Sequence, residues 1–182
     1  MPSTLDNIVA MTRSKLERRK AAANLRSLEA AAQKHSPRGF RRELLQAASS
    51  RPAIIAELKK ASPSRGVIRK DFKVAELAQQ LLAGGANALS VLTEEDHFQG
   101  SLEYLRTASS ITGLPCLRKD FMVDEFQVLE ARANCADAIL LIVAALEDDQ
   151  LRSLHAAARR FELDVLCEVH DRQELDRALD LG

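Results

Sequence analysis

Short apolar runs recur along this chain, and a stretch with the periodicity of an amphipathic helix follows each of them. The runs lie near residues 53–58, 87–92, 115–119, 137–143 and 164–169. The following stretches predict helices near 73–83, 101–111, 124–133, 147–161 and 171–181. This alternation, with a repeat of about 22 to 34 residues, is typical of strand–helix units in a parallel sheet.

Two of the runs indicate that the sheet is covered on both faces. Residues 138–143 and 89–92 are almost wholly apolar, as in parallel strands that lie between layers of helices. Strand–helix alternation allows an open doubly wound sheet or a closed barrel. No Gly-x-Gly-x-x-Gly run follows any of the strands, so a dinucleotide-binding sheet has no positive support. The sequence therefore favours an α/β fold of the TIM (β/α)8-barrel type.

The repeats divide the chain into two parts. Residues 1–50 predict an N-terminal helical extension, with one helix over 4–34 and a short one over about 40–49. Residues 51–182 predict a partial β/α barrel, units 1–5 of 8. Because the chain stops where a sixth strand would begin, we expect a barrel truncated after five βα units.

Charge is distributed unevenly along the chain, although the net charge is zero. Residues 1–50 hold ten Lys or Arg against four Asp or Glu. No aromatic residue is interleaved with these charges before Phe40, so a solvated helix near an anionic substrate is favoured over a nucleic-acid-binding arm. We expect no nucleic acid partner.

Hydropathy and cysteine content point to a cytoplasmic protein. The longest apolar run covers nine residues, 138–146, about half of what a membrane span needs, and the N-terminus lacks the apolar core of a secretory signal. We therefore expect no membrane partner. Cys116, Cys135 and Cys167 have no metal-ligand spacing and are expected to be buried, reduced thiols.

Three of the apolar runs turn charged at their carboxyl ends. Glu57 and Lys59 end the first, Lys119 the third and Glu168 the fifth. The two-residue period of a strand places Glu57 and Lys59 on the same face. If that face is the barrel interior, two acids and two bases converge at the pole where barrels carry their chemistry. Strand-end salt bridges are the alternative, but agreement among three strands favours a general acid–base site.

Other candidate site residues follow the strands in loops. The run Ser62-Pro63-Ser64-Arg65-Gly66 is a weak candidate for an anion site. Phe98 and Phe121 are candidates for the wall of an aromatic substrate pocket, although each is individually more typical of a core residue. His97 and His170 show no ligand spacing with Cys or Asp, so we expect no metal.

Five ordered motifs resemble those of the indole-3-glycerol-phosphate synthase family over essentially the whole chain. They are IAELKKASPS at 55–64, SVLTE at 90–94 with FQGS at 98–101, LRKDF at 117–121, AILLIVAAL at 138–146 and EVH at 168–170. The resemblance implies a carbon–carbon lyase of tryptophan biosynthesis. Such an enzyme converts 1-(2-carboxyphenylamino)-1-deoxyribulose 5-phosphate to indole-3-glycerol phosphate, with release of carbon dioxide and water, and needs no organic cofactor or metal.

The resemblance also implies roles for individual residues. Lys119 matches the general acid and Glu168 the general base. Lys59 matches a catalytic lysine that holds substrate anions and shares the acid role, and Glu57 matches its carboxylate partner. The residues that match the lining of the substrate pocket are Ser62, Phe98, Phe121 and Leu140.

Some elements of the family pattern are absent. The sixth-strand Asn and Arg and the phosphate-binding loops of strands 7 and 8 do not occur within 182 residues. We therefore expect a fragment with impaired activity. Asn134-Cys135 stands where the family usually has a glycine, and Asn tolerates the turn, so little effect is expected.

Two other functions remain open at this point. One is a non-catalytic half-barrel that associates with a second copy or a partner chain through its sheet edges. The other is a different phosphate-binding β/α-barrel enzyme, such as a phosphoribosylanthranilate isomerase. The two lysines and two glutamates at the strand ends argue against it, because that reaction uses a different acid–base pair. Fusion to, or association with, other tryptophan-pathway enzymes is also left open.

Overall fold

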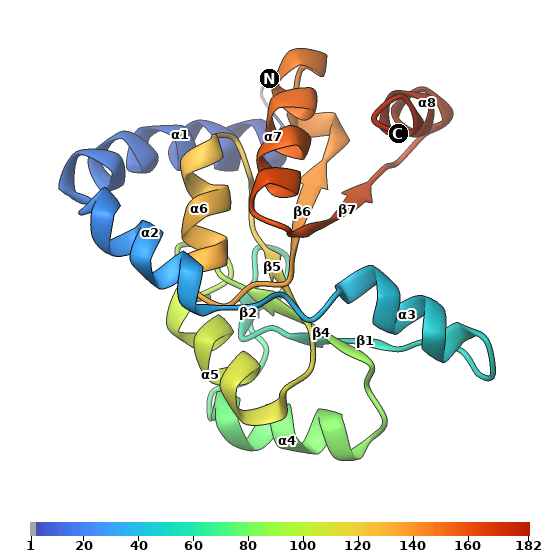
Figure 1. Cartoon of the computed structure of the whole chain (residues 1–182). Coiled ribbons are helices and arrows are strands. Elements are labelled where there is room, and N and C mark those ends of the chain that lie inside the picture. The colour runs from blue at the N-terminus through green and yellow to red at the C-terminus, as the bar shows by residue number, and fades with distance from the viewer. Residues whose placement is uncertain (1–2) are drawn as a thin grey trace.

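The computed structural model describes residues 3–182 and contains a parallel sheet of five strands in chain order (Figure 1). The strands are β1 (Ile55–Leu58), β4 (Ala88–Leu92), β5 (Cys116–Lys119), β6 (Ala138–Ile142) and β7 (Asp164–Glu168). Each is hydrogen-bonded in parallel to the next, from β1 at one edge to β7 at the other. The α/β class and the parallel sheet are therefore confirmed.

A helix follows each of these strands before the next one begins, and the last helix follows β7. The helices are α4 (Val74–Ala83), α5 (Leu102–Thr112), α6 (Glu125–Ala133), α7 (Asp148–Arg160) and α8 (Arg172–Leu179). Asp124 and Asp171 cap α6 and α8 by accepting backbone N–H bonds, which explains why these helices begin where they do. Every expected strand and helix of the repeat is present within about two residues of its expected bounds, because strand periodicity and caps are local signals.

Alternation along the strands separates two apolar clusters. Odd and even positions point to opposite faces, so Leu89, Val91 and Ile139 pack outward against the helices. The inner face carries a smaller cluster that includes Ala88, Leu117 and Leu140. Its edges are open: Ile55 on β1 and Leu166 on β7 remain 38% and 36% exposed, since each edge strand has one neighbour among the described residues.

The N-terminal region forms three helices, α1 (Thr4–Ala22), α2 (Leu25–Lys34) and α3 (Phe40–Ala48). The expectation of one continuous helix over 4–34 was wrong. The chain becomes extended at residues 23 and 24, and the Asn24 side chain caps α2 by accepting the Ser27 N–H at 3.1 Å. Because an Asn within an apolar-periodic stretch also fits a continuous helix, the periodicity did not reveal this break.

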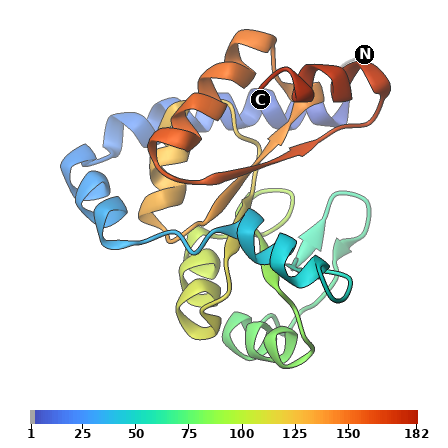
Figure 2. The ribbon, with the colours of Figure 1, turned by 45° about the vertical axis from the view of Figure 1, so that its right-hand side comes forward.

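Helices α1 and α3 close opposite ends of the inner face. Phe40 of α3 packs with Ala88, Leu117 and Ala138, near the amino ends of the strands. Helix α1 lies across the carboxyl ends (Figure 1, Figure 2). Ion pairs Lys15–Asp96, Arg19–Glu130 and Lys20–Asp124 hold α1 to the loops and helix at that end. Within the described residues, no helix is long and apolar enough to cross a membrane.

Two segments differ from the expected elements. The loop after β1 contains a short antiparallel hairpin, β2 (Ala61–Ser62) and β3 (Gly66–Val67). Strand β6 ends at Ile142, and the apolar residues after it form a 3-10 turn, η1 (Val143–Ala145), instead of prolonging the strand to 143. An apolar run does not reveal such a change in backbone conformation, since both conformations bury the same side chains.

A buried carboxylate joins the N-terminal region to the sheet. Asp137 has no exposure to solvent, and its oxygens accept the backbone N–H groups of Arg38 and Cys116, each at 2.7 Å. The Arg38 guanidinium donates to the same carboxylate at 3.1 Å, and His35 Nε2 lies 3.2 Å away. One side chain therefore fixes the segment between α2 and α3 against the amino ends of β5 and β6.

We predict that Asp137→Ala lowers the free energy of unfolding by about 3–5 kcal/mol, because it leaves buried donors and the Arg38 charge without their partner. Urea unfolding followed by circular dichroism measures the change. Asp149→Ala, at a side chain that is 99% exposed, is the control and is expected to change the value by less than about 0.5 kcal/mol. Equal effects of the two substitutions would contradict this assignment.

Candidate active site

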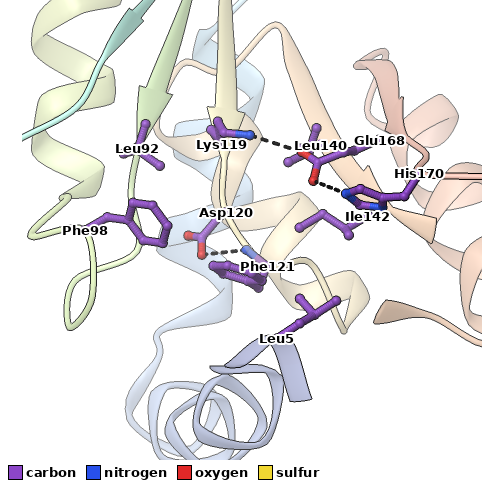
Figure 3. A pocket seen from close by; sticks show the side chains of 10 residues that line it. All are labelled: Leu5, Leu92, Phe98, Lys119, Asp120, Phe121, Leu140, Ile142, Glu168 and His170. Atoms are coloured by element: carbon purple, nitrogen blue, oxygen red, sulfur yellow. Dashed lines mark hydrogen bonds and ion pairs between the residues drawn. The ribbon is translucent and has the colours of Figure 1, made fainter. Parts of the chain in front are cut away.

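A cavity of about 270 Å³ opens at the carboxyl ends of the strands, next to the start of α1, from which Leu5 reaches it (Figure 3). It is lined by Leu5, Leu92, Phe98, Lys119, Asp120, Phe121, Leu140, Ile142, Glu168 and His170. Five of the eight candidate site residues lie here: Lys119, Glu168, Phe98, Phe121 and Leu140. Most of the lining is apolar, and a few ionisable groups point into it, which is the usual composition of a small-molecule site.

Lys119 and Glu168 face each other across the cavity. Lys119 Nζ lies 3.2 Å from Glu168 Oε2, and both side chains are about two-thirds buried. They come from the last residues of β5 and β7, so the pair spans the intervening strand β6. The other oxygen of Glu168 lies 3.4 Å from His170 Nε2 (Figure 3). The arrangement places the Lys119 ammonium group, a proton donor, next to a carboxylate whose second oxygen contacts the His170 ring.

Glu57 and Lys59 form a separate pair on β1. Lys59 Nζ lies 2.6 Å from Glu57 Oε1, and neither residue lines the cavity. Strand β4 separates β1 from β5 and presents Leu92 at the level of Lys119. The structure thus arranges the four charged groups as two ion pairs, whereas the sequence predicted a single converging cluster.

Ser62 lies in the β2–β3 hairpin, outside the cavity lining. Its carbonyl oxygen accepts the Arg65 N–H at 3.3 Å, as expected of a tight hairpin turn. The hairpin touches the site indirectly, because the Ala61 N–H donates to the Phe98 carbonyl at 3.2 Å.

The aromatic wall consists of Phe98 and Phe121, whose ring centroids are 6.2 Å apart with a tilt of 41°. Phe98 is positioned by Glu94, whose buried carboxylate accepts the backbone N–H groups of Asp96, His97 and Phe98 at 2.7–3.0 Å. Gly100 closes this turn by donating its N–H to the Glu94 carbonyl at 2.7 Å. A Cβ at residue 100 would collide with the Leu92 carbonyl, so glycine is required.

The residues Glu94, Asp96 and His97 have oxygen and nitrogen atoms within 4.8 Å of one another. Their existing contacts explain this grouping without an ion. Glu94 is occupied by backbone N–H groups, and Lys15 places its ammonium on Asp96, where it would repel a cation. The group acts as the support of the Phe98 turn.

The chain matches one known protein family over almost its whole length. The family model described as indole-3-glycerol phosphate synthase matches residues 5–182. The chain belongs to this family. The indole-3-glycerol phosphate synthase of Koribacter versatilis (strain Ellin345) is 58% identical over 182 residues, which is 100% of this chain and 70% of that protein. The expected carboxy-lyase of tryptophan biosynthesis, acting on a phosphorylated small molecule, is thereby confirmed.

Five residues that line the cavity of this synthase were not predicted from the sequence: Leu5, Leu92, Asp120, Ile142 and His170. Strand alternation could have predicted Leu92 and Ile142, because each lies two residues from another side chain on the inner face. Leu5 carried no such signal. It reaches the site because α1 folds back across the sheet, a contact between residues more than 100 positions apart in the chain.

The cysteines were expected to be buried, and this holds fully for Cys116 alone. Cys135 and Cys167 are only partly buried. Burial raises the pKa of the Cys116 thiol to about 12, with a smaller contribution from the neighbouring Asp137 carboxylate. Burial also raises the pKa of the other two thiols. All three cysteines are free.

We predict that iodoacetamide at pH 8 modifies Cys135 and Cys167 of the folded chain but leaves Cys116 essentially unmodified. The thiolate is the reactive form, and a pKa of about 12 makes it scarce at Cys116, which is also shielded from the reagent. Peptide mass spectrometry measures the modification. In urea all three should react at similar rates, and rapid alkylation of Cys116 in the folded chain would contradict the prediction.

We also predict that Gly100→Ala weakens binding of a substrate analogue about tenfold or more, since the Phe98 turn must move to admit the methyl group. The probe is the substrate with its carbonyl reduced to an alcohol, titrated by calorimetry. Gly84→Ala is the matched control, because a Cβ there meets no atom closer than 3.3 Å. Equal affinities of the two variants would show that the turn does not position Phe98.

Proposed function

We propose that Lys119 and Glu168 are the acid–base pair of the decarboxylating ring closure. The observation that carries this proposal is their 3.2 Å contact inside a mostly apolar cavity at the carboxyl ends of the strands. The substrate is 1-(2-carboxyphenylamino)-1-deoxyribulose 5-phosphate. The products are indole-3-glycerol phosphate, carbon dioxide and water.

The first step needs an acid at the substrate carbonyl. As the carboxylate-bearing ring carbon attacks the carbonyl carbon, Lys119 donates a proton to the carbonyl oxygen, which becomes a hydroxyl group. Carbon dioxide then leaves, and the electrons of its bond restore the aromatic ring. In this low-dielectric cavity an ammonium group also stabilises the negative charge that develops on oxygen.

The second step is a dehydration. Glu168 removes a proton from the ring carbon next to the one that bears the new hydroxyl group. The hydroxyl group takes up a proton from solvent and leaves as water, and the double bond that forms between the two carbons completes the pyrrole ring. The Glu168 carboxylate is well placed for this role, because Lys119 and His170 contact its two oxygens from opposite sides. Its 3.2 Å contact with Lys119 also allows the pair to exchange a proton and return to the starting state.

The cavity walls suit the aromatic part of the substrate. We assign Phe98, Phe121 and Leu140 to the ring, and the 6.2 Å separation of the two phenyl rings supports this assignment. Lys59 would hold a substrate anion, with Glu57 fixing its ammonium at 2.6 Å. Ser62 would contribute through the hairpin that borders Phe98.

The finer architecture is also a proposal. We propose that residues 51–182 form units 1–5 of a (β/α)8 barrel and that residues 1–50 form its helical extension. The chain-ordered parallel sheet and its separate inner and outer clusters support this interpretation. Three free cysteines support a cytoplasmic location. The open inner edges at Ile55 and Leu166 would accept further strands or an associated chain.

We predict that Lys119→Ala and Glu168→Gln each lower kcat by about 10²–10⁴, because each removes one proton-transfer group. Indole-3-glycerol phosphate formation, followed by indole fluorescence, measures the rate. Lys73→Ala, at a surface lysine whose side chain is 57% exposed, is the control and should leave the rate unchanged.

The Koribacter versatilis enzyme serves as the positive control for the assay. Variants of Lys119 and Glu168 that retain full activity would refute the assigned roles. If the chain binds the reduced analogue but does not turn over substrate, Lys119 and Glu168 would serve binding and not catalysis.

A further inference from the structure

Gln127 is a polar side chain that the proposed reaction leaves unexplained. It lies in the first turns of α6, and the residue has no exposure to solvent. A buried amide is costly unless its donor and its acceptor are both satisfied. The contacts it makes therefore indicate why a glutamine stands there.

Both ends of the amide bind the backbone of the loop between β5 and α6. Gln127 Nε2 donates to the Phe121 carbonyl at 3.0 Å, and Oε1 accepts the Val123 N–H at 2.8 Å. A carboxylate could accept but not donate, and an apolar side chain could do neither. Only an amide of this length meets both demands of the loop.

The remaining backbone polar group of Phe121, its N–H, is held by a second buried side chain. Its N–H donates to Asp120 Oδ1 at 2.9 Å (Figure 3). Phe121 therefore has both its N–H and its carbonyl fixed by buried side chains, while its ring lines the cavity next to Phe98.

Arg118 connects these two supports. Its guanidinium donates to the Gln127 backbone carbonyl at 2.8 Å and to Asp120 Oδ2 at 3.0 Å. Since Arg118 has no exposure to solvent, water does not compete for these bonds. Hydrogen bonds thus connect Asp120, Arg118 and Gln127 around the Phe121 backbone.

We propose that Gln127 is a positioning residue for the substrate pocket, which fixes the Phe121 ring against the aromatic ring of the substrate. The proposal rests on the proposed function, because it assumes that Phe121 contacts substrate. Gln127 itself does not line the cavity and acts through the Phe121 and Val123 backbone.

A double-mutant cycle tests this role. Gln127→Met, Phe121→Leu and the double variant are titrated with the reduced substrate analogue, whose anthranilate-type fluorescence is free of tryptophan background because the chain has no Trp. We expect Gln127→Met to weaken binding about tenfold when Phe121 is present and less than about twofold in the Phe121→Leu background. A role confined to the stability of α6 would weaken binding equally in both backgrounds and would overturn the proposal.

Hydrogen exchange of the Val123 amide gives a second readout that does not depend on substrate. Gln127→Met should speed this exchange, whereas Gln127→Glu, which keeps an acceptor, should leave Val123 protected but place an oxygen against the Phe121 carbonyl. Gln127→Glu should therefore also weaken binding, and it keeps the test open if the Met variant does not fold. Val128→Ala, at a buried neighbour on α6 that has no bond to the loop, is the matched control and should change neither readout.

The outcomes distinguish the two proposals. If the unsubstituted chain does not bind the analogue, the proposed function is refuted. If Val123 exchange is nevertheless fast in Gln127→Met, Gln127 supports the loop alone. If the unsubstituted chain binds the analogue and neither Gln127→Met nor Gln127→Glu changes the affinity, the positioning role is overturned and the proposed function stands.

Discussion

The buried guanidinium of Arg118 is the interaction on which the carboxyl end of the sheet depends. Removing a cation from water costs several kcal/mol unless hydrogen bonds replace its hydration. Here Asp120 and the Gln127 backbone carbonyl accept its hydrogen bonds at 2.8–3.2 Å, and a Glu130 carboxylate oxygen lies 2.9 Å away, so two carboxylates compensate the charge. Because Glu130 also pairs with Arg19, the same network reaches from β5 through α6 to α1, the helix that covers the cavity. An arginine inside the protein thus determines how three elements meet at the site.

This burial has a direct consequence for the chemistry. Successive residues of a strand point to opposite faces, so an Arg118 side chain directed into the helix layer places Lys119 on the inner face. There Lys119 meets Glu168, which arrives from β7, two strands away. The position of the proposed acid–base pair is therefore a result of strand geometry and of the outward position of the preceding charge. It does not require a dedicated loop, and sites on rigid strands hold their geometry well.

The opposite end of β5 is fixed by a different device. Asp137 accepts bonds from Arg38 and Cys116 and anchors the segment that leads into α3, whose Phe40 fills the inner face. Strand β5 is thus held at its start by the buried Asp137 carboxylate and at its end by the buried Arg118 guanidinium. The apolar positions between them pack against helices on one face and against the inner cluster on the other. In a β/α barrel this division matches stability at the amino pole and chemistry at the carboxyl pole.

The sequence by itself determined the strand–helix repeat, the charged carboxyl ends of the strands that carry Lys119 and Glu168, and the family, because periodicity, caps and ordered motifs are local features that need no knowledge of neighbours. The tertiary structure alone decided which groups touch. It separated Glu57–Lys59 from Lys119–Glu168, since β4 lies between their strands, and it broke the first predicted helix at Asn24. It also brought Leu5 into the cavity and joined Gln127 to Phe121. Such contacts depend on how strands are ordered and how helices fold back, and the spacing of residues along the chain does not determine either.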